Sequence, residues 1–358
     1  MKILRPISIV ICLSLPAASA VAQIQLTPQP GQTPAKASKA AKPAKARIIK
    51  PAAAKKPAPA ATPAAPSQLP SSAATAPTAD DPNADVVFGA YQRGQYKTAF
   101  DLATKRAEIG DPKAMAMLGE LYSGGLGVKR DYAKAAEWYK RAADLGDREA
   151  MFALAMQRIS GRGGPVNREE GAKLLASSAK LGSPKAAYNL ALLYLDGQTL
   201  PQDVKRAAEL LRISADAGNP EAQYALATFY KEGTGVEKDL NKAVRLLQAA
   251  SLADNVDAEV EYAIALYNGT GTPKNETAAV ALLRKAARQN SPIAQNRLAG
   301  VLVARPDAPE DRIEGLKWHI VAKTAGKGDL TLDEALAQAS PEDRAKAEDA
   351  ARKWLGAK

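Results

Sequence analysis

The stretch DPKAMAMLGELYSGGLGVKRDYAKAAEWYKRAADLG, from Asp111 to Gly146, is the first of six consecutive 36-residue segments that align without a gap. The other five begin at Asp147, Ser183, Asn219, Asn255 and Ser291. Every first residue is of a type whose side chain accepts a bond from the unpaired amides at a helix start. An alanine follows three residues later in every segment, as expected where two helices approach closely. The first half of each segment therefore predicts an amphipathic helix with a stripe of small residues.

The second half of each segment predicts another helix. Capping residue types recur at Asp131, Asn167, Asp203, Asp239, Asn275 and Asp311. The segments close on residues that tolerate a left-handed backbone, namely Gly146, Gly182, Gly218, Asp254, Asn290 and Gly326. Each segment is thus predicted to be a helical hairpin, and hairpins that bury their faces on their neighbours stack into an all-α solenoid.

The turn between the two helices raises a separate question, because YKEGTGVEKD (Tyr230 to Asp239) has the glycines and lysine of a phosphate-binding loop. A phosphate loop would follow a strand and lead into a required lysine. Here the glycine pattern follows a predicted helix and recurs in other segments. The position of Lys238 holds Arg, Val, Gln, Lys or Glu elsewhere, so it requires no cation. The stretch is interpreted as a turn.

The residues around the six segments, which cover 111–326, predict further helices. Residues 85–110 predict a shorter helical hairpin with its turn near Gly94. Residues 327–358 predict two closing helices, Leu332 to Ala339 and Pro341 to Leu355, with Ser340 as the cap of the second. The charged face of the last helix suits the solvent-facing end of a solenoid.

The N-terminus has the features of an export signal over residues 1–22: Lys2 and Arg5, a short apolar run, and small-residue patterns that allow cleavage after Ala20 or Ala22. We therefore expect an exported, periplasmic bacterial protein without a transmembrane segment after cleavage. Residues 23–84 are rich in Pro, Ala and Lys and contain no aromatic residue, which predicts a disordered basic linker. This linker is either a soluble spacer or an arm that contacts the anionic envelope.

The stretch AMLGELYSGGLGVKRDYAKAAEWYKRAADLG within the first segment resembles the Sel1-like repeat, a relative of the tetratricopeptide repeat with a longer inter-helix turn. The resemblance extends over all six segments and is weakest in the sixth, which lacks the turn glycines. It implies a right-handed α-solenoid whose first helices line a concave surface. It also implies an adaptor or scaffold role in protein complexes, as in bacterial envelope and signalling proteins, although a fold does not by itself fix a function.

The residues that could carry chemistry are few. Cys12, the only cysteine, lies in the signal, and His319 is the only histidine, which is interpreted as a packing or helix-surface residue. We predict no catalytic, cofactor or metal site. Nucleic acid is not an expected partner, because the basic character belongs to the linker of an exported chain.

The candidate partner-binding residues lie mostly on the first helices. Phe152, Tyr188 and Tyr224 occupy the same position in consecutive segments, where they either anchor a partner or pack in the core. The accompanying candidates are Lys231, Tyr267 and Arg158, the last of which replaces a tyrosine found in other segments.

Two functions from different classes follow from these features. The leading hypothesis is a non-enzymatic, exported scaffold that binds a protein or peptide in the concave groove, in envelope signalling or assembly. The alternative is a peptidoglycan- or glycan-associated binding module or a cell-wall enzyme, which would need carboxylates or an aromatic platform working on sugar.

Overall fold

The computed structural model describes residues 86–305 and 308–356, and every regular element in these ranges is an α-helix. The predicted signal and basic linker lie outside these residues. The helices are α1 (Val86–Gln92), α2 (Tyr96–Glu108), α3 (Pro112–Gly124), α4 (Tyr132–Asp144), α5 (Arg148–Ser160), α6 (Arg168–Lys180), α7 (Pro184–Asp196), α8 (Val204–Asp216), α9 (Pro220–Glu232), α10 (Leu240–Leu252), α11 (Val256–Asn268), α12 (Glu276–Arg288), α13 (Pro292–Val303), α14 (Pro309–Thr324), α15 (Leu330–Ala337) and α16 (Pro341–Gly356). The all-α prediction is confirmed.

The repeated capping residues begin the helices as predicted. The side chain at each segment start accepts a bond from the backbone amide three residues on, for example Asp147 Oδ1 from Ala150 N at 2.7 Å. The ends of the second helices are equally regular. Asp147 N donates to the Ala142 carbonyl at 3.0 Å around Gly146, whose φ is 89°. This bond closes a Schellman-type helix end. Asp254 and Asn290 adopt the same left-handed backbone, with φ of 59° and 64°.

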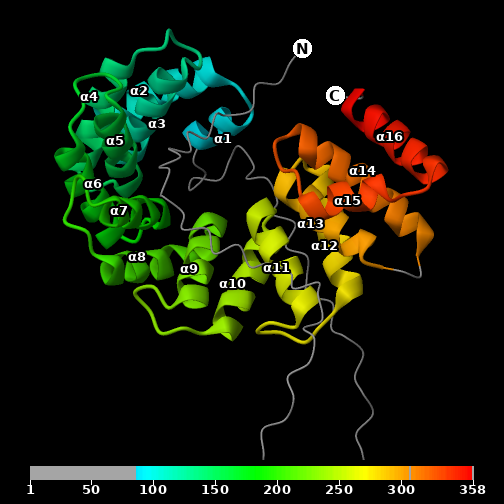
Figure 1. Cartoon of the computed structure of the whole chain (residues 1–358). Coiled ribbons are helices and arrows are strands. Elements are labelled where there is room, and N and C mark those ends of the chain that lie inside the picture. Colours follow the sequence, from blue (N-terminus) through cyan, green and yellow to red (C-terminus); the bar gives the residue numbers. More distant parts are fainter. Residues whose placement is uncertain (1–85, 306–307, 357–358) are drawn as a thin grey trace, which may run out of the picture. The chain divides into compact units, whose positions relative to one another are not determined.

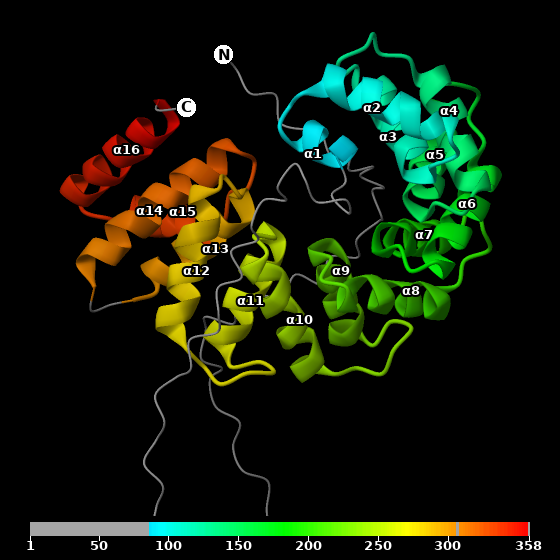
Figure 2. The same ribbon diagram turned by 180° about the vertical axis from the view of Figure 1, so that it is seen from behind.

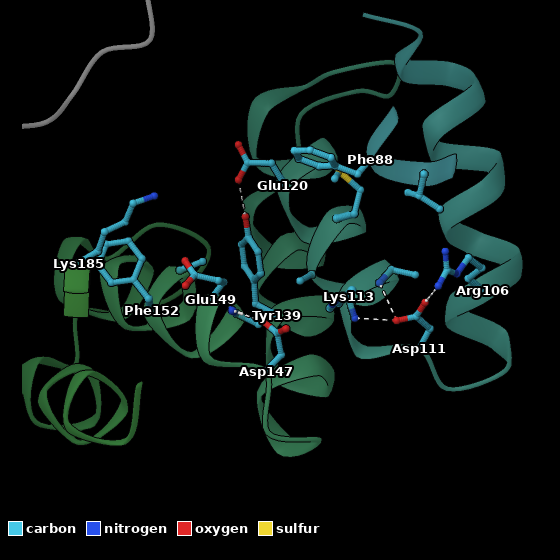
Figure 3. A pocket seen from close by; sticks show the side chains of 16 residues that line it. Phe88, Arg106, Asp111, Lys113, Glu120, Tyr139, Asp147, Glu149, Phe152 and Lys185 are labelled. Atoms are coloured by element: carbon cyan, nitrogen blue, oxygen red, sulfur yellow. Dashed lines mark hydrogen bonds and ion pairs between the residues drawn. The ribbon is translucent and has the colours of Figure 1, made fainter. Parts of the chain in front are cut away.

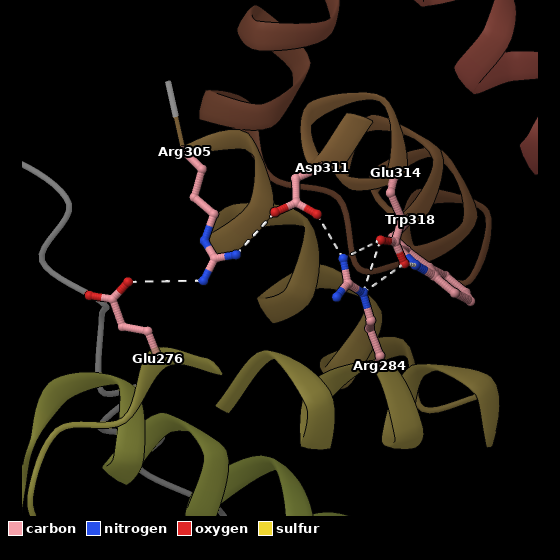
Figure 4. Close-up of polar contacts among 6 residues, drawn as sticks. All are labelled: Glu276, Arg284, Arg305, Asp311, Glu314 and Trp318. Carbon is pink, nitrogen blue, oxygen red and sulfur yellow. Dashed lines mark hydrogen bonds and ion pairs between the residues drawn. The ribbon is translucent and has the colours of Figure 1, made fainter. Parts of the chain in front are cut away.

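The prediction that Asp311 caps the second helix of the sixth segment is wrong. Helix α14 begins earlier, at Pro309, after Ala308, which makes no side-chain cap bond. Proline at the first helical position is favoured because its fixed φ suits a helix and its missing N–H costs nothing there. Asp311 therefore lies inside the first turn, where it accepts from Arg284 Nη2 at 2.7 Å and from Arg305 Nη1 at 3.0 Å (Figure 4).

Successive hairpins stack side by side in chain order from α1 to α14 (Figure 1), and the view from behind shows the same order (Figure 2). The first helices (α3, α5, α7, α9, α11 and α13) form one layer, here called the first-helix layer. The second helices (α4, α6, α8, α10, α12 and α14) form the second-helix layer. Each second helix packs on its own first helix, and those from α4 to α12 also pack on the next first helix along the chain.

The recurring small residues lie at these helix contacts. The alanine of each first helix is at most 2% exposed, at positions 114, 150, 186, 222, 258 and 294. Gly119 illustrates the tight fit, because a Cβ atom there would lie 2.6 Å from the Tyr139 ring. The small-residue stripe is thus explained by close approach of the paired helices.

The turn after α9 confirms the interpretation of YKEGTGVEKD. Gly233 ends the helix with φ of 80°, and Asp239 N donates back to the Tyr230 carbonyl at 2.9 Å. Asp239 Oδ1 then accepts from Lys242 N at 2.9 Å to begin α10. Gly233 and Asp239 therefore both serve the connection between α9 and α10.

The chain ends in two helices beyond the hairpins. Helix α15 begins at Leu330, two residues before the predicted start, because Asp329 caps it through a 3.2 Å bond from Leu332 N. Ser340 Oγ accepts from Asp343 N at 3.1 Å at the start of α16, as predicted. Helix α16 packs on α14, where the rings of Trp318 and Trp354 meet edge to face with centroids 5.0 Å apart. No helix within 86–305 and 308–356 is long and apolar enough to cross a membrane.

Candidate functional site

A pocket of about 450 Å³ opens on the first-helix layer at its N-terminal end (Figure 3). We call it the first-helix pocket. Its lining comes from α1 to α5 and α7, and consists of Val87, Phe88, Arg106, Asp111, Lys113, Ala114, Ala116, Met117, Glu120, Tyr139, Asp147, Glu149, Ala150, Phe152, Ala153 and Lys185. The pocket therefore exists only because four hairpins are stacked in order.

The floor of the first-helix pocket is apolar. Val87 is 3% exposed, whereas Met117, Phe152 and Ala153 are half-buried and Phe88 is 49% exposed. Phe152 and Phe88 lie toward opposite ends of the pocket in Figure 3. An apolar floor with two phenylalanine rings offers area for burial against a ligand, at about 25 cal/mol for each Å² removed from water.

The carboxylates at the edge of the pocket already have partners. Asp111 Oδ2 pairs with Arg106 Nη2 at 2.6 Å, and Glu120 Oε2 accepts from the Tyr139 hydroxyl at 3.0 Å. Burial raises the pKa of Tyr139 far above its usual range, and the charge of Glu120 adds to this. Glu149 contacts Arg148 Nε at 3.4 Å. These contacts hold the edge of the pocket in place while its floor stays apolar.

The three aromatic residues predicted as partner anchors lie on one face of the first-helix layer and are all half-buried. Phe152 and Tyr188 pack against one hydrophobic cluster, and Tyr224 packs against the next. Only Phe152 lines the first-helix pocket. Burial raises the pKa of Tyr188 above its ordinary value, and Glu221 raises it further. These rings thus contribute to the core and present one edge to solvent.

The other three predicted residues are placed differently. Lys231 Nζ lies 2.8 Å from Glu261 Oε2 on α11 and bridges neighbouring first helices. Tyr267 packs on a hydrophobic cluster, with Lys274 Nζ 5.7 Å from its ring centroid. Arg158 Nε donates to Glu170 Oε1 on α6 at 3.0 Å, so it faces the second helix of its own hairpin. None of these three lines the first-helix pocket.

The sequence reading missed several residues of this pocket. Phe88 lies in the short N-terminal hairpin, which has no periodic pattern to mark it. Met117 stands on α3 at a position that carries unrelated residue types in the other segments, and the position of Lys113 carries a lysine again only at Lys185. Their spacing in the sequence was the one signal that could have found them. Positions three, four and seven residues apart share a helix face, and Lys113, Met117 and Glu120 have that spacing.

His319 is a packing residue. It is fully buried, and its Nε2 atom lies 2.8 Å from Asp333 Oδ1, which also accepts from Lys323 Nζ at 2.6 Å. The contact with Lys323 lowers the pKa of Asp333 most, and the contact with His319 lowers it further. No group of side chains suited to hold a metal ion occurs among the described residues.

The family comparison decides what kind of protein carries this pocket. The family model for the Sel1 repeat matches five consecutive stretches, residues 112–147, 148–183, 184–219, 220–255 and 256–291. The chain belongs to the Sel1 repeat family. Sel1 repeats are generally protein-interaction scaffolds and are typically not enzymes. The sixth segment is not part of this match, although α13 and α14 pack as a hairpin like those before them.

Solved structures show the same Sel1 repeat fold. A Sel1 repeat protein from Oxalobacter formigenes is 26% identical, with a TM-score of 0.59 over 67% of this chain and 98% of that one. The protein c5321, described as a protective antigen of uropathogenic Escherichia coli strains, is 24% identical with a TM-score of 0.64. That match covers 72% of this chain and 57% of c5321, so this chain spans little more than half of it. The comparison with curated proteins gave no match.

Proposed function

We propose that this Sel1 repeat protein is an exported, non-enzymatic scaffold of the bacterial envelope that binds a polypeptide segment of a partner protein in the first-helix pocket. The observation that carries the proposal is the apolar floor formed by Val87, Met117, Phe152 and Ala153, which no single hairpin contains. Sel1 repeats in general support protein–protein interaction, which makes a polypeptide the expected ligand. The export part rests on the signal-like pattern of residues 1–22.

Two partly exposed tyrosines extend the proposed binding surface beyond the first-helix pocket. Tyr188 and Tyr224 continue the line of Phe152 along the first-helix layer, and each keeps part of its ring accessible. Large, rigid side chains of this kind dominate binding energy because they bury much area at low cost in conformational entropy. A bound segment that begins over Phe152 would therefore find further contacts on α7 and α9.

Site-specific photo-crosslinking in cells tests the proposal. A photoreactive side chain is placed at Met117 or Phe152, and matched controls carry it at Lys173 or Lys205, which are exposed on the second-helix layer. We expect a discrete protein adduct from the two pocket positions and none from the controls. Equal adducts at all four positions, or none from the pocket, would contradict pocket binding. The mass of the purified mature chain separately tests cleavage after Ala20 or Ala22.

A further inference from the structure

A second, smaller pocket of about 240 Å³ is lined by α8 and α10 of the second-helix layer and by α9 at its base. We call it the second-layer cleft, and its lining is Arg212, Asp216, Leu226, Tyr230, Lys242, Arg245 and Leu246. Leu226 is 2% exposed, while Tyr230 and Leu246 are half-buried, so the base of the cleft is apolar. The three cations are exposed around this base.

The charges of the cleft are not balanced. Three cations and one carboxylate, Asp216, line the cleft, and of the cations only Lys242 has an ion-pair partner, Asp239, among the described residues. Lys242 Nζ lies 3.2 Å from Asp239 and 5.3 Å from the Tyr230 ring centroid. Within residues 86–305 and 308–356, neither Arg212 nor Arg245 forms an ion pair, and Asp216 forms none either. The cleft thus gathers two guanidinium groups that form no ion pair, beside the equally unpaired carboxylate of Asp216.

The repeat architecture supplies an internal comparison. Arg284 occupies the position of Arg212 two segments later, and Glu314 lies 30 residues after Arg284. Arg284 Nη2 donates to Glu314 Oε2 at 2.7 Å, as Figure 4 shows. The residue 30 positions after Arg212 is Lys242. A cation therefore stands in this cleft where the same geometry elsewhere places a neutralising carboxylate.

The equivalent positions in two earlier hairpins carry ion pairs. Arg158 pairs with Glu170 at 3.0 Å where Tyr230 and Lys242 stand in the second-layer cleft. Arg206 pairs with Glu209 at 2.7 Å, at the positions of Lys242 and Arg245. Like-charged neighbours repel one another, so an anion bound beside the unpaired Arg212 and Arg245 would lower the energy of these two charges.

From these contacts we propose that the second-layer cleft binds a phosphoryl group carried on a partly apolar body. A phosphate monoester has a charge of about −1.5 to −2 at neutral pH and three acceptor oxygens, so one such group can accept from both Arg212 and Arg245. Guanidinium groups match the oxygens of a phosphate with paired N–H donors. The base formed by Leu226, Tyr230 and Leu246 would hold the apolar carbon atoms next to the phosphoryl group.

The variant Lys242→Glu removes the site while sparing the helix. Lys242 is the third residue of α10, and a carboxylate in the first turn is favoured by the partial positive charge of a helix N-terminus. The new carboxylate would face Arg212 as Glu314 faces Arg284. Arg245→Gln provides a second variant that keeps size and polarity. The matched control is Lys205→Glu, which makes the same charge change in the first turn of α8 outside the cleft.

Binding of phenyl phosphate to the full chain is measured by titration calorimetry, with phenylacetate as the carboxylate counterpart and melting curves as the folding control. We expect saturable binding of phenyl phosphate, weakened about tenfold or more by Lys242→Glu and by Arg245→Gln and unchanged by Lys205→Glu. Absence of saturable binding, or equal weakening by Lys205→Glu, would overturn the site. Equal affinity for phenylacetate would overturn the preference for a phosphoryl group.

The source of the phosphoryl group is distinguished by vesicles. Co-sedimentation with phosphatidic acid vesicles, but not with phosphatidylcholine vesicles, and its loss in Lys242→Glu would assign a lipid headgroup. Phenyl phosphate binding without vesicle binding would assign a soluble phosphate ester. Either result supports the cleft as a phosphoryl site. Phenyl phosphate binding that survives Lys242→Glu together with vesicle binding contradicts it.

Discussion

Gly235 lies directly against the start of α8: a Cβ atom at Gly235 would be 2.7 Å from the carbonyl oxygen of Val204. The turn of one hairpin is thus pressed onto the second helix of the hairpin before it. Gly127, Gly163 and Gly271 make the same approach to Tyr96, Tyr132 and Leu240. The second turn glycine recurs because of this contact, in addition to its left-handed backbone.

Gly235→Ala is accordingly expected to destabilise the protein more than Gly218→Ala. Both glycines have positive φ, 67° and 85°, so both alanines carry the backbone strain of about 1 kcal/mol. Only the alanine at 235 also meets backbone atoms, because nothing lies within 4 Å of a Cβ at Gly218. Urea denaturation followed by circular dichroism measures both losses. Equal losses would show that the turn does not rest on α8 in solution.

Ser178 and Ser214 occupy one position in neighbouring segments and are both fully buried, but they differ in bonding. Ser178 Oγ donates to the Arg148 carbonyl at 2.7 Å, whereas Ser214 Oγ has no partner among the described residues. We expect Ser178→Ala to lower the free energy of unfolding by about 1 kcal/mol and Ser214→Ala to leave it unchanged or raise it. Thermal denaturation of the pair gives the answer, and a larger loss at 214 would contradict the assignment.

Gln157 is 5% exposed, and neither atom of its amide finds a hydrogen-bond partner among the described residues. Leu121 and Leu193 occupy its position in the flanking segments and are buried. Gln157→Leu is therefore expected to raise the free energy of unfolding by about 1 kcal/mol or more. The control is Gln295→Leu, which should destabilise, because Gln295 Nε2 donates to the Ala287 carbonyl at 3.1 Å. A loss of stability in Gln157→Leu would indicate an unseen partner for the amide.

Alkaline pH is expected to destabilise the fold through its buried tyrosines. Burial raises the pKa of Tyr224 to about 12 from 10.0, and Glu261 and Asp257 add to the shift. Between these values the unfolded chain has lost the phenol proton that the folded chain retains, so the free energy of unfolding falls as pH rises. Tyr224→Phe should flatten this fall, as measured by denaturation midpoints between pH 10 and 12. An unchanged slope would mean that Tyr224 titrates alike in both states.

The sequence predicted those features that depend on neighbouring residues in the chain. Capping residues such as Asp147 and Asn219, and left-handed helix ends such as Asn290, act over a few residues, so their spacing alone located them. The prediction failed at Asp311, where a neighbouring proline and a distant arginine changed the role of the carboxylate. Pro309 started the helix, and distant Arg284 recruited the carboxylate.

The candidate site was less predictable, because its parts come together only by stacking. Phe152 was identified from its row of aromatic residues, yet Phe88 and Met117 join it through contacts between separate hairpins. Arg158 was predicted as a binding residue because it replaces a tyrosine of other segments. The direction of its side chain, however, depends on its hydrogen bond to Glu170, twelve residues away on the next helix. Likewise, a lysine at position 242 becomes informative only by comparison with the later hairpins, where Arg284 pairs with Glu314 at the equivalent positions.

The docking of α16 on α14 has a consequence for assembly. In a stack of similar helical hairpins, the last hairpin has a face on which another hairpin can pack, either from the same molecule or from a neighbouring one. Here Ala347 and Ala351 of α16 are buried against that face, Trp354 meets Trp318, and Lys346 and Lys353 remain exposed outward. Helix α16 thus covers the face of α14 on which a further hairpin would pack, and its removal is expected to expose this face to self-association.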